Sequence, residues 1–265
     1  MNVVVCVKQV PDTSDPDTEV HIDSSGRDVE RSKFSFVIND ADNYAVEEAI
    51  LLKEKHGGEV TVVNIGPETA NQVIRMALAK GGDKAIRLED EKFEFSDAVC
   101  TARLLASAIK DIEYDIVMTG CIATDDGYTA TGVALGQVLG LPHAAYVKSV
   151  EVVEEGKLKV GRELEGGIME MLEIQTPCVL TIQTGINEPR YASFKGIRAA
   201  SKKEIKLMDL AATGLSEDEA GEAGSKSVMV QYSVPEVGEL AEMLEGDAAE
   251  TSGKLAGILK EKGLV

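Results

Sequence analysis

The sequence predicts an α/β fold built on a doubly wound, mostly parallel sheet. Over the first two thirds of the 265 residues, short β-branched runs alternate with helical patterns, which is the order expected of such a sheet. Residues 3–7 form a continuous apolar run, as expected of a central parallel strand that is buried on both faces. After Pro142 the pattern changes to successive extended segments, which predict an added β-hairpin region.

The predicted helices and strands alternate along the first part of the chain. Further strands are predicted at 59–65, 85–88 and 115–119, and helices at 42–55, 68–80, 96–110 and from 132 to about 139. The first of these helices has acidic residues early and lysines late, as the helix dipole favours, and Gly57 ends it. Ser96 is predicted to cap the third helix.

The remainder of the chain predicts a hairpin region and an extended arm. The segments 149–153 and 157–162 are expected to pair, and 169–174 and 178–183 are expected to be extended. Residues 1–207 are assigned to the α/β domain and residues 208–265 to a C-terminal arm with short helices at 236–244 and 252–262. Up to about Gly224 the arm is acidic and rich in Gly, Ala and Ser, so we expect either a mobile linker or an arm that orders only on a partner.

The composition argues against several functional classes. With 27 Lys and Arg against 46 Asp and Glu, the formal net charge of −19 repels nucleic acid and anionic lipid surfaces. No apolar run approaches the roughly 18 residues that a membrane span needs, and the N-terminus lacks the basic region of a signal peptide. The four cysteines lie far apart without a nearby His pair, so we expect reduced thiols in a cytoplasmic protein and no metal site.

The most informative stretch follows the fourth predicted strand. Ligands of open α/β sheets bind beyond the carboxyl ends of the strands, next to helix N-termini. Residues 119–132 combine glycines with the hydroxyls of Thr124, Thr129 and Thr131 and with a helix start that offers free N–H donors. The stretch therefore suits a nucleotide phosphate. These residues alone leave open the alternative of a loop capped by Asp and Thr that binds no ligand.

Motifs of turnover enzymes are absent from the sequence. There is no G-x-x-x-x-G-K-[ST] loop and no G-x-G-x-x-G after a strand. Residues 24–28 are interpreted as a turn rather than a pyrophosphatase loop. Gly132, Gly136 and Gly140, which repeat every four residues, are interpreted as positions where a helix approaches the sheet. No Ser-His-Asp or Cys-His set has a readable spacing, and Asp125 and Asp126 have no evident acid–base partner. A nucleotide site without catalytic groups predicts binding or carrying.

Several ordered motifs resemble the β (small) subunit of electron-transfer flavoproteins. The run from Val160 to Gly167, followed by Glu170, Leu172 and residues 176–181, resembles the signature of that family. Residues 187–194, Asn-Glu-Pro-Arg-Tyr-Ala-Ser-Phe, resemble its partner-recognition loop, and a lysine-rich stretch follows. Further landmarks fall at 6–10, 45–49 and 120–132, so the resemblance extends over the chain to about residue 207.

The resemblance implies a heterodimeric electron carrier rather than an enzyme. Members pair with an α subunit and carry electrons from acyl-CoA and related dehydrogenases toward a membrane quinone oxidoreductase. The α subunit binds most of the redox FAD across the interface, while the β subunit, of the HUP-like adenine-nucleotide-binding type, holds a buried AMP. By position, the AMP pocket comprises Cys6, Asn39, Asp40, Ala41, Asp42, Ile65, Gly120, Cys121, Ile122, Ala123, Thr124, Asp125, Asp126, Gly127, Tyr128, Thr129, Ala130 and Thr131, with Gly132 opening the helix.

The resemblance also implies residues that contact partners. Phe194 stands where members carry an aliphatic anchor that inserts into the dehydrogenase, and Tyr191 lies in the same recognition loop, at about 184–206. An aromatic side chain at position 194 still supplies an apolar anchor. Glu163 stands where an acidic residue contacts an α-subunit arginine near the flavin, and the alternative is a solvated strand charge. The arm at 208–265 is expected to pack on the α subunit.

The identity of the nucleotide in the pocket depends on residues 125–132. The pair Asp125-Asp126 and the dipeptide Thr131-Gly132 resemble transfer-only members that hold AMP, which is the favoured reading. The dipeptide Thr129-Ala130 and the absence of an aromatic residue from 39–42 resemble electron-bifurcating members, which hold a second FAD there. Outside the family, a stand-alone nucleotide-binding regulator of universal-stress type shares the expected fold. Such a regulator needs neither an α subunit nor a basic recognition loop.

Overall fold

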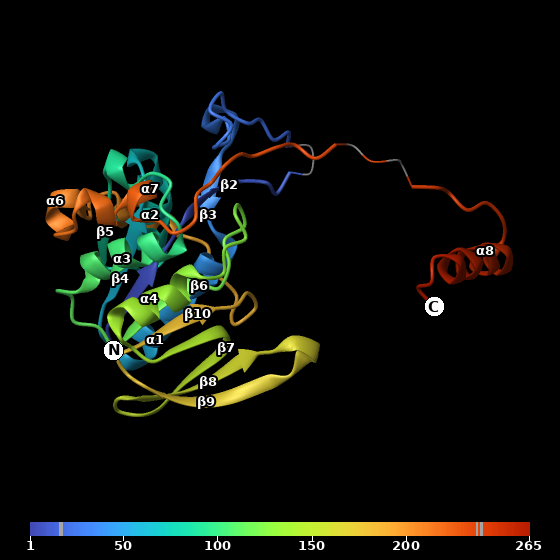
Figure 1. Ribbon diagram of the computed structural model, residues 1–265. Coiled ribbons are helices and arrows are strands. Elements are labelled where there is room, and N and C mark those ends of the chain that lie inside the picture. Colours follow the sequence, from blue (N-terminus) through green and yellow to red (C-terminus); the bar gives the residue numbers. More distant parts are fainter. Residues whose placement is uncertain (16–17, 237, 239–240) are drawn as a thin grey trace. The chain divides into compact units, whose positions relative to one another are not determined.

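The structure is a computed structural model that describes residues 1–15, 18–236, 238 and 241–265 (Figure 1). The chain forms two compact units, Met1–Gln231 and Tyr232–Val265. The first unit contains the sheet, and the second contains helix α8 (Ala248–Glu261).

Within the described residues, the first unit is built on a nine-stranded sheet with the order β11-β5-β4-β1-β6-β10-β7-β8-β9. The neighbours from β11 to β7 run parallel, whereas β7, β8 and β9 pair antiparallel. The strands are β1 (Val3–Cys6), β4 (Val60–Ile65), β5 (Lys84–Leu88), β6 (Ile116–Gly120), β7 (His143–Glu154), β8 (Lys157–Glu163), β9 (Met169–Gln175), β10 (Cys178–Ile182) and β11 (Ile205–Met208), with β2 (Gln9–Pro11) and β3 (Phe36–Ile38) as a separate pair. This arrangement confirms the predicted fold class.

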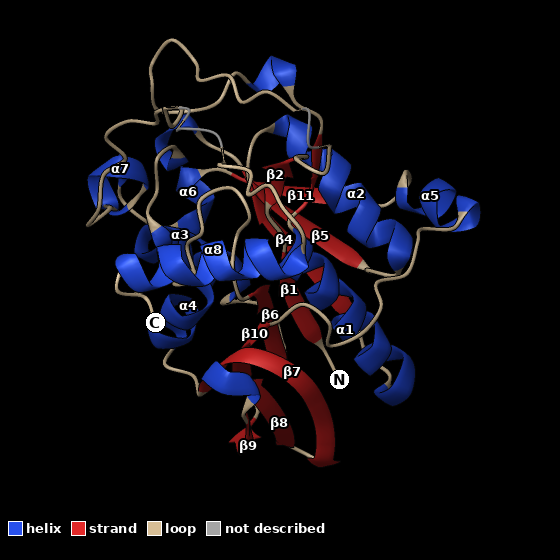
Figure 2. Ribbon diagram, turned by 90° about the vertical axis from the view of Figure 1, so that its right-hand side faces the viewer, coloured by secondary structure: helices blue, strands red, loops and turns tan. Residues whose placement is uncertain are grey.

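Helices cover both faces of the sheet. Helices α1 (Asp40–His56) and α2 (Asn71–Lys80) lie on one face, and α3 (Ala98–Ile109) and α4 (Thr131–Leu139) lie on the other (Figure 2). The short helices are α5 (Phe194–Ala200), α6 (Leu210–Thr213), α7 (Gly221–Gly224) and the 3-10 turns η1 (Arg31–Lys33), η2 (Glu68–Ala70), η3 (Glu91–Phe93), η4 (Glu165–Gly167) and η5 (Glu217–Glu219).

The apolar run at the N-terminus becomes the central strand β1 because both of its faces are covered. Val3 and Val5 pack in the core with α1 and α2, whereas Val4 and Cys6 pack in the core with α3 and α4. Strand β1 lies between β4 and β6, so the chain extends the sheet outward from β1 in both directions. Open α/β sheets bind ligands at such a switch in direction, outside the carboxyl ends of the strands.

Several predicted element starts differ from the structure. Helix α1 begins at Asp40 rather than at residue 42. The side chain of Asp97, not that of Ser96, caps α3 by accepting hydrogen bonds from the N–H groups of Val99 and Cys100, while Ser96 Oγ donates to the Phe93 carbonyl. Strand β7 begins at His143 instead of residue 149, because its first part pairs with β10 before its second part pairs with β8. The first strand of the predicted hairpin is therefore only the second half of the longer strand β7, and β8 is its other strand.

Residues 208–231 pack against the sheet domain, which the sequence did not predict. The first unit ends at Gln231, so the domain boundary lies beyond the expected residue 207. Strand β11 adds to the sheet edge beside β5, and Thr213 and Ala220 are buried. The cap of α3, Asp97, also accepts hydrogen bonds from the N–H groups of Lys226 and Ser227. This part of the expected arm is thus ordered within the chain itself.

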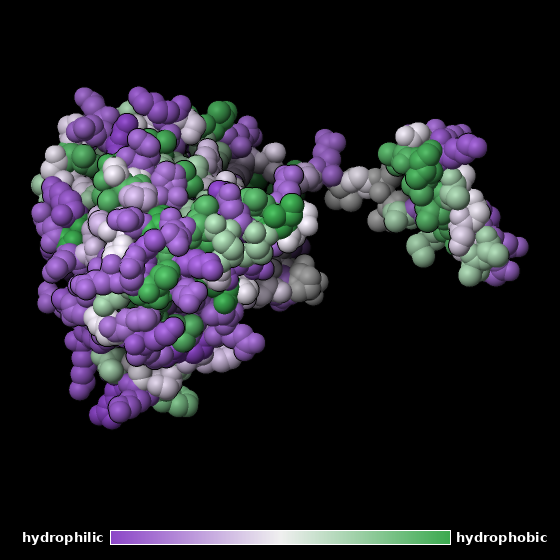
Figure 3. Space-filling view, turned by 90° about the horizontal axis from the view of Figure 1, so that it is seen from below, coloured by the Kyte–Doolittle hydropathy of each residue, from purple (hydrophilic) through white to green (hydrophobic). Residues whose placement is uncertain are grey.

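The second unit contains the end of the predicted arm. The helix expected at 236–244 includes residues 237, 239 and 240, which lie outside the described residues, and the described residues 241–244 are not helical. Helix α8 begins at Ala248, four residues before the predicted start at 252, where Asp247 accepts hydrogen bonds from the N–H groups of Ala249 and Glu250. Its described residues include no buried side chain, and hydrophobic residues gather on the surface of this unit (Figure 3).

Candidate functional site

The carboxyl ends of β1 and β6 lie side by side at the switch in strand direction, where open α/β sheets form a ligand-binding crevice, and Asp42 connects the two strands there. Its Oδ2 accepts a 2.7 Å hydrogen bond from the N–H of Lys8, which follows β1. Its Oδ1 accepts a 2.7 Å hydrogen bond from the N–H of Gly120, the last residue of β6. The Asp42 residue is 6% exposed, so the start of α1 joins the ends of the two strands from inside.

The buried position changes the acidity of Asp42. Burial raises the pKa of its carboxyl group to about 6, although the hydrogen bonds from the N–H groups of Lys8 and Gly120 oppose this shift. Near neutral pH the group is still mostly ionised. The two N–H donors offset part of the cost of burying this charge, and burial is the larger effect.

The side chain of Asn39 fixes the loop at residues 121–130. Its Nδ2 donates a 2.8 Å hydrogen bond to the carbonyl of Ile122, and its Oδ1 accepts a 3.0 Å hydrogen bond from the N–H of Thr124. Asn39 is 1% exposed and stands at the N-cap position of α1, but its side chain makes no capping bond there. The amide is therefore used for the loop rather than for its own helix.

An ion pair closes the loop over the end of β1. The Nζ of Lys8 lies 2.6 Å from Oδ1 of Asp125 and 2.7 Å from Oδ2 of Asp126. Burial lowers the pKa of the Lys8 ammonium group, but the two carboxylates outweigh that effect and the net shift is upward. Lys8 thus supplies the partner that the sequence did not reveal for Asp125 and Asp126. The available signal was its position, directly after the first strand.

Two glycines bring the helices close to the strand ends. A Cβ atom on Gly132 would lie 2.3 Å from Oγ1 of Thr119 and 2.5 Å from Cγ2 of Thr181. A Cβ atom on Gly120 would lie 2.4 Å from Oδ1 of Asp42. Any other residue at these positions would push α4 or α1 away from the sheet, which agrees with the close helix approach expected at Gly132.

The start of α4 leaves donors available in the crevice. The N-cap residue Ala130 has no side chain that could accept hydrogen bonds from the first-turn N–H groups. These groups, from Thr131 onward, follow directly after the loop that Asn39 and Lys8 fix. Uncapped N–H groups at a helix start, together with the positive end of the helix dipole, form a binding position for an anion.

The other predicted pocket residues divide into two groups. Cys6, Ala41 and Cys121 are buried, and Ile65 packs partly buried against the same core as Cys6. Asp40 and the loop residues Ile122, Thr124, Gly127, Tyr128, Thr129 and Ala130 are exposed, and Ala123 is half-buried. The hydroxyl of Tyr128 lies 3.4 Å from Oγ of Ser227. The structure therefore brings the predicted residues to one edge of the sheet, with the loop facing solvent.

Glu163 connects to this edge through its neighbours. The Nε2 of Gln183 donates a 3.4 Å hydrogen bond to Oε2 of Glu163, and Sγ of Cys121 lies 3.4 Å from Oε1 of the same glutamine. Lys148 Nζ lies 3.6 Å from the Glu163 carboxylate. Burial raises the pKa of Cys121 to about 11, which keeps its thiol neutral. Gln183 was not among the predicted site residues. In the sequence it is only the last residue of the expected extended segment 178–183.

Helix α1 also fixes residues 184–206, which we call the recognition segment. The guanidinium of Arg190 contacts Glu47, whose side chain is 4% exposed, at 3.0 Å and Glu54 at 2.6 Å. The Nδ2 of Asn187 donates a 2.9 Å hydrogen bond to Oε2 of Glu48. The sequence predicted this segment as a loop, but in the structure it contains α5 and the start of β11.

The two aromatic residues of the recognition segment point away from the protein. Tyr191 is 99% exposed and Phe194 is 94% exposed. Ser193 caps α5 by accepting a hydrogen bond from the N–H of Gly196, so Phe194 is the first residue of a short helix. Exposed apolar side chains that form a contiguous patch typically mark an interaction site, whereas single ones are common on protein surfaces.

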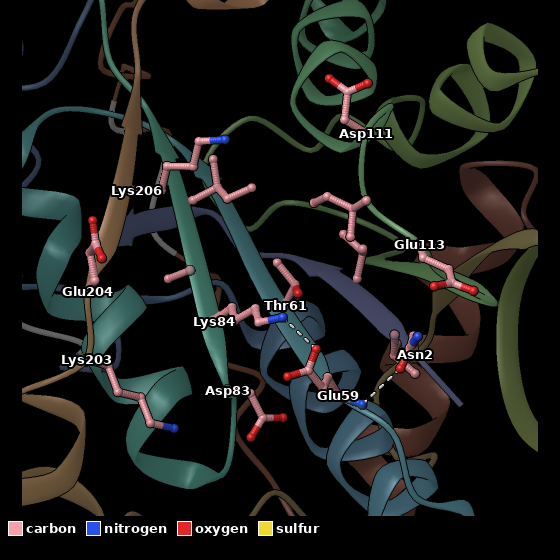
Figure 4. A pocket seen from close by; sticks show the side chains of 15 residues that line it. Asn2, Glu59, Thr61, Asp83, Lys84, Asp111, Glu113, Lys203, Glu204 and Lys206 are labelled. Atoms are coloured by element: carbon pink, nitrogen blue, oxygen red, sulfur yellow. Dashed lines mark hydrogen bonds and ion pairs between the residues drawn. The ribbon is translucent and has the colours of Figure 1, made fainter.

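A cavity of about 570 Å³ lies elsewhere, at the amino ends of the strands (Figure 4). Lys84 Nζ lies 2.6 Å from Glu59 Oε2 in its wall, and Asp83, which also lines it, pairs with Lys53 at 2.9 Å. In open α/β sheets the bound ligands lie outside the carboxyl ends of the strands, next to helix N-termini. We therefore do not assign the functional site to this cavity, which lies at the amino ends. Within the described residues, no group of three His, Cys, Asp or Glu side chains could hold a metal ion.

The strand order and the helices on both faces place the chain among open, doubly wound α/β proteins. Residues 29–213 match the family model described as "Electron transfer flavoprotein domain". The chain is 38% identical over 264 residues to "Electron transfer flavoprotein subunit beta" of Methylophilus methylotrophus, covering 98% of both chains. The protein of that name from Clostridium acetobutylicum is 36% identical over 262 residues, 99% of both chains. The chain therefore belongs to the electron transfer flavoprotein family.

A third relative carries a different name. The "Caffeyl-CoA reductase-Etf complex subunit CarD" of Acetobacterium woodii is 35% identical over 269 residues, covering 100% of both chains. Family membership confirms the resemblance to β subunits, supports an electron-transfer role in a flavin-containing complex, and implies an α subunit as partner. No described helix is both long enough and apolar enough to cross a membrane.

Proposed function

We propose that this chain is the β subunit of a heterodimeric electron transfer flavoprotein that carries electrons and has no turnover reaction of its own. In this proposal the donor is an acyl-CoA-type dehydrogenase, and the acceptor is a quinone oxidoreductase or a protein of similar role. The exposed aromatic residues Tyr191 and Phe194 support a docking role, because they lie on a segment that α1 fixes in place.

The crevice between β1 and β6 is proposed to hold AMP. The observation that carries this assignment is the uncapped start of α4, whose N–H groups suit a phosphate. Lys8 pairs with Asp125 and Asp126, which reduces the repulsion that these two carboxylates would exert on a phosphate. Asn39 and Asp42 would keep the loop and the strand ends in position.

The FAD of the complex is proposed to lie at the interface with the α subunit, where it supplies the oxidation and reduction chemistry. Glu163 is the residue of this chain proposed to contact the α subunit near the flavin. Its carboxylate is partly exposed beside Lys148 and Gln183, so it remains accessible to an additional cation from a partner. Helix α8, which has no buried side chain among its described residues, is proposed to pack on the α subunit as well.

A second candidate is an electron-bifurcating flavoprotein with a second FAD in the crevice. The relative named as part of a caffeyl-CoA reductase–Etf complex favours this candidate, as do Thr129 and Ala130 in the loop. Asp125, Asp126, Thr131 and Gly132 favour AMP. The fold and hydrogen bonds of the crevice are compatible with either adenine nucleotide, because either one would present a phosphate to α4.

A nucleotide count tests both candidates. The chain is co-expressed with its α subunit, the complex is purified and denatured, and the released FAD and AMP are quantified by chromatography. Equal amounts of FAD and AMP support a transfer-only carrier. Two FAD per heterodimer without AMP would establish the bifurcating type. A stable heterodimer without either nucleotide would overturn the proposed function, and a chain that stays monomeric beside the α subunit would favour a stand-alone regulator.

A further inference from the structure

The loop at residues 121–130 is attached near its start through a buried contact. Asn39, which is 1% exposed, holds this part by its hydrogen bonds with the backbone of Ile122 and Thr124. Neutral hydrogen bonds at a buried position respond little to dissolved salt. We therefore expect this end of the loop to stay in place at any ionic strength.

The tip of the loop, residues 125–129, is attached in a different way. Oδ1 of Asp125 and Oδ2 of Asp126 lie 2.6 Å and 2.7 Å from Nζ of Lys8. The two carboxylate side chains are 28% and 27% exposed, and that of Lys8 is 40% exposed. The only other hydrogen bond from the tip to another described segment is the 3.4 Å contact between Tyr128 and Ser227. Lys8 therefore supplies most of the polar attachment of the tip.

The backbone of Lys8 is fixed on both sides. Its N–H donates a 2.7 Å hydrogen bond to Asp42, and its carbonyl accepts a 2.9 Å hydrogen bond from the N–H of Asn39. Lys8 follows β1, whereas the loop follows β6, and these two strands are neighbours in the sheet. The ion pairs therefore cross the crevice, from the end of one strand to the loop that follows the other.

The tip keeps its shape through hydrogen bonds of its own. The N–H of Gly127 donates a 3.0 Å hydrogen bond to the carbonyl of Ala123, and the N–H of Tyr128 donates a 2.8 Å hydrogen bond to Oδ1 of Asp126. Neither bond involves Lys8. When the ion pairs break, the tip can therefore move as a unit while the start of the loop stays attached.

We infer that Lys8, Asp125 and Asp126 form an ionic latch that closes the loop across the crevice and sets the rate at which the nucleotide leaves. Lys8 is a positioning residue in this role, because it acts through the loop. The uncapped N–H groups of α4 follow directly after the tip, so movement of the tip opens a path to the proposed phosphate position. The inference rests on the proposed function, because the ligand that leaves is the nucleotide proposed for the crevice.

The first test measures the release of AMP from the heterodimer. The complex, purified with its nucleotide, is mixed with excess isotope-labelled AMP at about 0.01 M and 0.15 M ionic strength, and mass spectrometry follows the replacement of bound AMP. Lys8→Met is compared with Lys8→Arg, which retains the charge. The control is Lys84→Met, which breaks a 2.6 Å pair with Glu59 at the amino ends of the strands. The unfolding midpoint of each heterodimer is measured alongside, so that misfolding is recognised.

The expected result separates the two substitutions of Lys8. At low ionic strength, Lys8→Met releases AMP about fivefold faster than the wild type, and salt accelerates release much less in this variant. Lys8→Arg and Lys84→Met stay within about twofold of the wild type. Equal rates in Lys8→Met and the wild type would overturn the inference alone. A wild-type heterodimer that contains no nucleotide would overturn the proposed site and the inference together.

A triple variant separates the latch from simple charge compensation. In Lys8→Met the two carboxylates also lose their cation and repel a phosphate, which by itself speeds release. Lys8→Met/Asp125→Asn/Asp126→Asn removes this repulsion together with the latch. The inference expects release from the triple variant to stay within about twofold of Lys8→Met. A return to the wild-type rate would overturn it, because Lys8 would then act through its charge alone.

Amide hydrogen exchange follows the loop itself. In the heterodimer, Lys8→Met should speed exchange at residues 125–130 about fivefold and leave residues 60–65 of β4 unchanged. Unchanged exchange at 125–130 would overturn the inference. The same measurement tests the latch in a heterodimer that holds FAD instead of AMP in the crevice.

Discussion

Helix α1 fixes both the crevice and the recognition segment, but the two regions present opposite chemistry. At the start of α1, the buried side chains of Asn39 and Asp42 form hydrogen bonds with the backbone around the crevice. Further along, Glu47 and Glu54 contact Arg190, and the aromatic side chains near Arg190 face solvent. One helix thus positions buried polar groups at the proposed nucleotide site and exposed apolar groups on the proposed docking segment.

The pH dependence of stability should differ in sign between the two regions, and this is the largest expected effect. Burial raises the folded-state pKa of Asp42 to about 6, above its unfolded value of about 3.8. Its contribution to the free energy of unfolding is therefore full below about pH 4 and is lost as pH rises through about 6, a change of about 3 kcal/mol. A carbon-13 titration of the Asp42 carboxyl group measures this pKa, and a value below 4 would contradict the prediction.

Glu54 should respond in the opposite direction. Its hydrogen bond with Arg190 lowers the pKa of the Glu54 carboxyl group. Its contribution to stability is present above the unfolded pKa and is lost as pH falls through the lower folded value. The free energies of unfolding of Glu54→Gln and the wild type should therefore be similar at low pH and differ at neutral pH. A constant separation over that range would show that the ion pair does not respond to pH.

The substitution Arg190→Ala should disturb the recognition segment through its attachment to α1. It leaves the buried Glu47 carboxylate without its cation and should lower the free energy of unfolding by about 2 kcal/mol. The loss is smaller than for a fully buried ion pair, because Arg190 is partly exposed. Electron acceptance from the dehydrogenase should also slow, while nucleotide content stays unchanged. The control is Arg31→Ala, which breaks an exposed pair with Asp28 and should cost under about 1 kcal/mol. Equal losses in both variants would contradict the proposed attachment.

The substitution Asn39→Ala should disturb the crevice through the same helix. It removes both hydrogen bonds to residues 121–130 and should lower the free energy of unfolding by about 2 kcal/mol and reduce the nucleotide content of the purified heterodimer. The matched control is Asn187→Ala, since it removes an amide that attaches the recognition segment to Glu48. That control should keep its nucleotide. Nucleotide loss from both variants, or from neither, would contradict separate roles for the two ends of α1.

The substitution Phe194→Ala should produce the smallest effect on stability and a selective effect on electron transfer. The side chain is 94% exposed, so the unfolding midpoint and the flavin content should stay unchanged. Reduction by the dehydrogenase should slow about tenfold, because an exposed apolar anchor carries a large share of an interface's binding energy. Val230→Ala, at a side chain that is 83% exposed, serves as the control. Unchanged kinetics in Phe194→Ala would remove the anchor assignment.

Much of the fold could be predicted because it depends on local patterns. The run at residues 3–7 indicates a strand buried on both faces, and it is the central strand β1. The glycines and hydroxyls at 119–132 indicate a strand–loop–helix junction, and the structure has one at β6 and α4. Such features follow from the spacing of apolar side chains and from backbone preferences, which neighbouring residues determine.

The long-range contacts could not be predicted. Lys8 pairs with Asp125 across 117 positions, and Arg190 reaches Glu47 across 143. The packing of residues 208–231 depends equally on distant partners, such as the Asp97 carboxylate that accepts from Lys226. By itself, the sequence determined the α/β order, the position of the crevice loop and the family. Only the tertiary structure decided which charged side chains meet, because that depends on how the folded sheet brings distant segments together, and no local pattern encodes it.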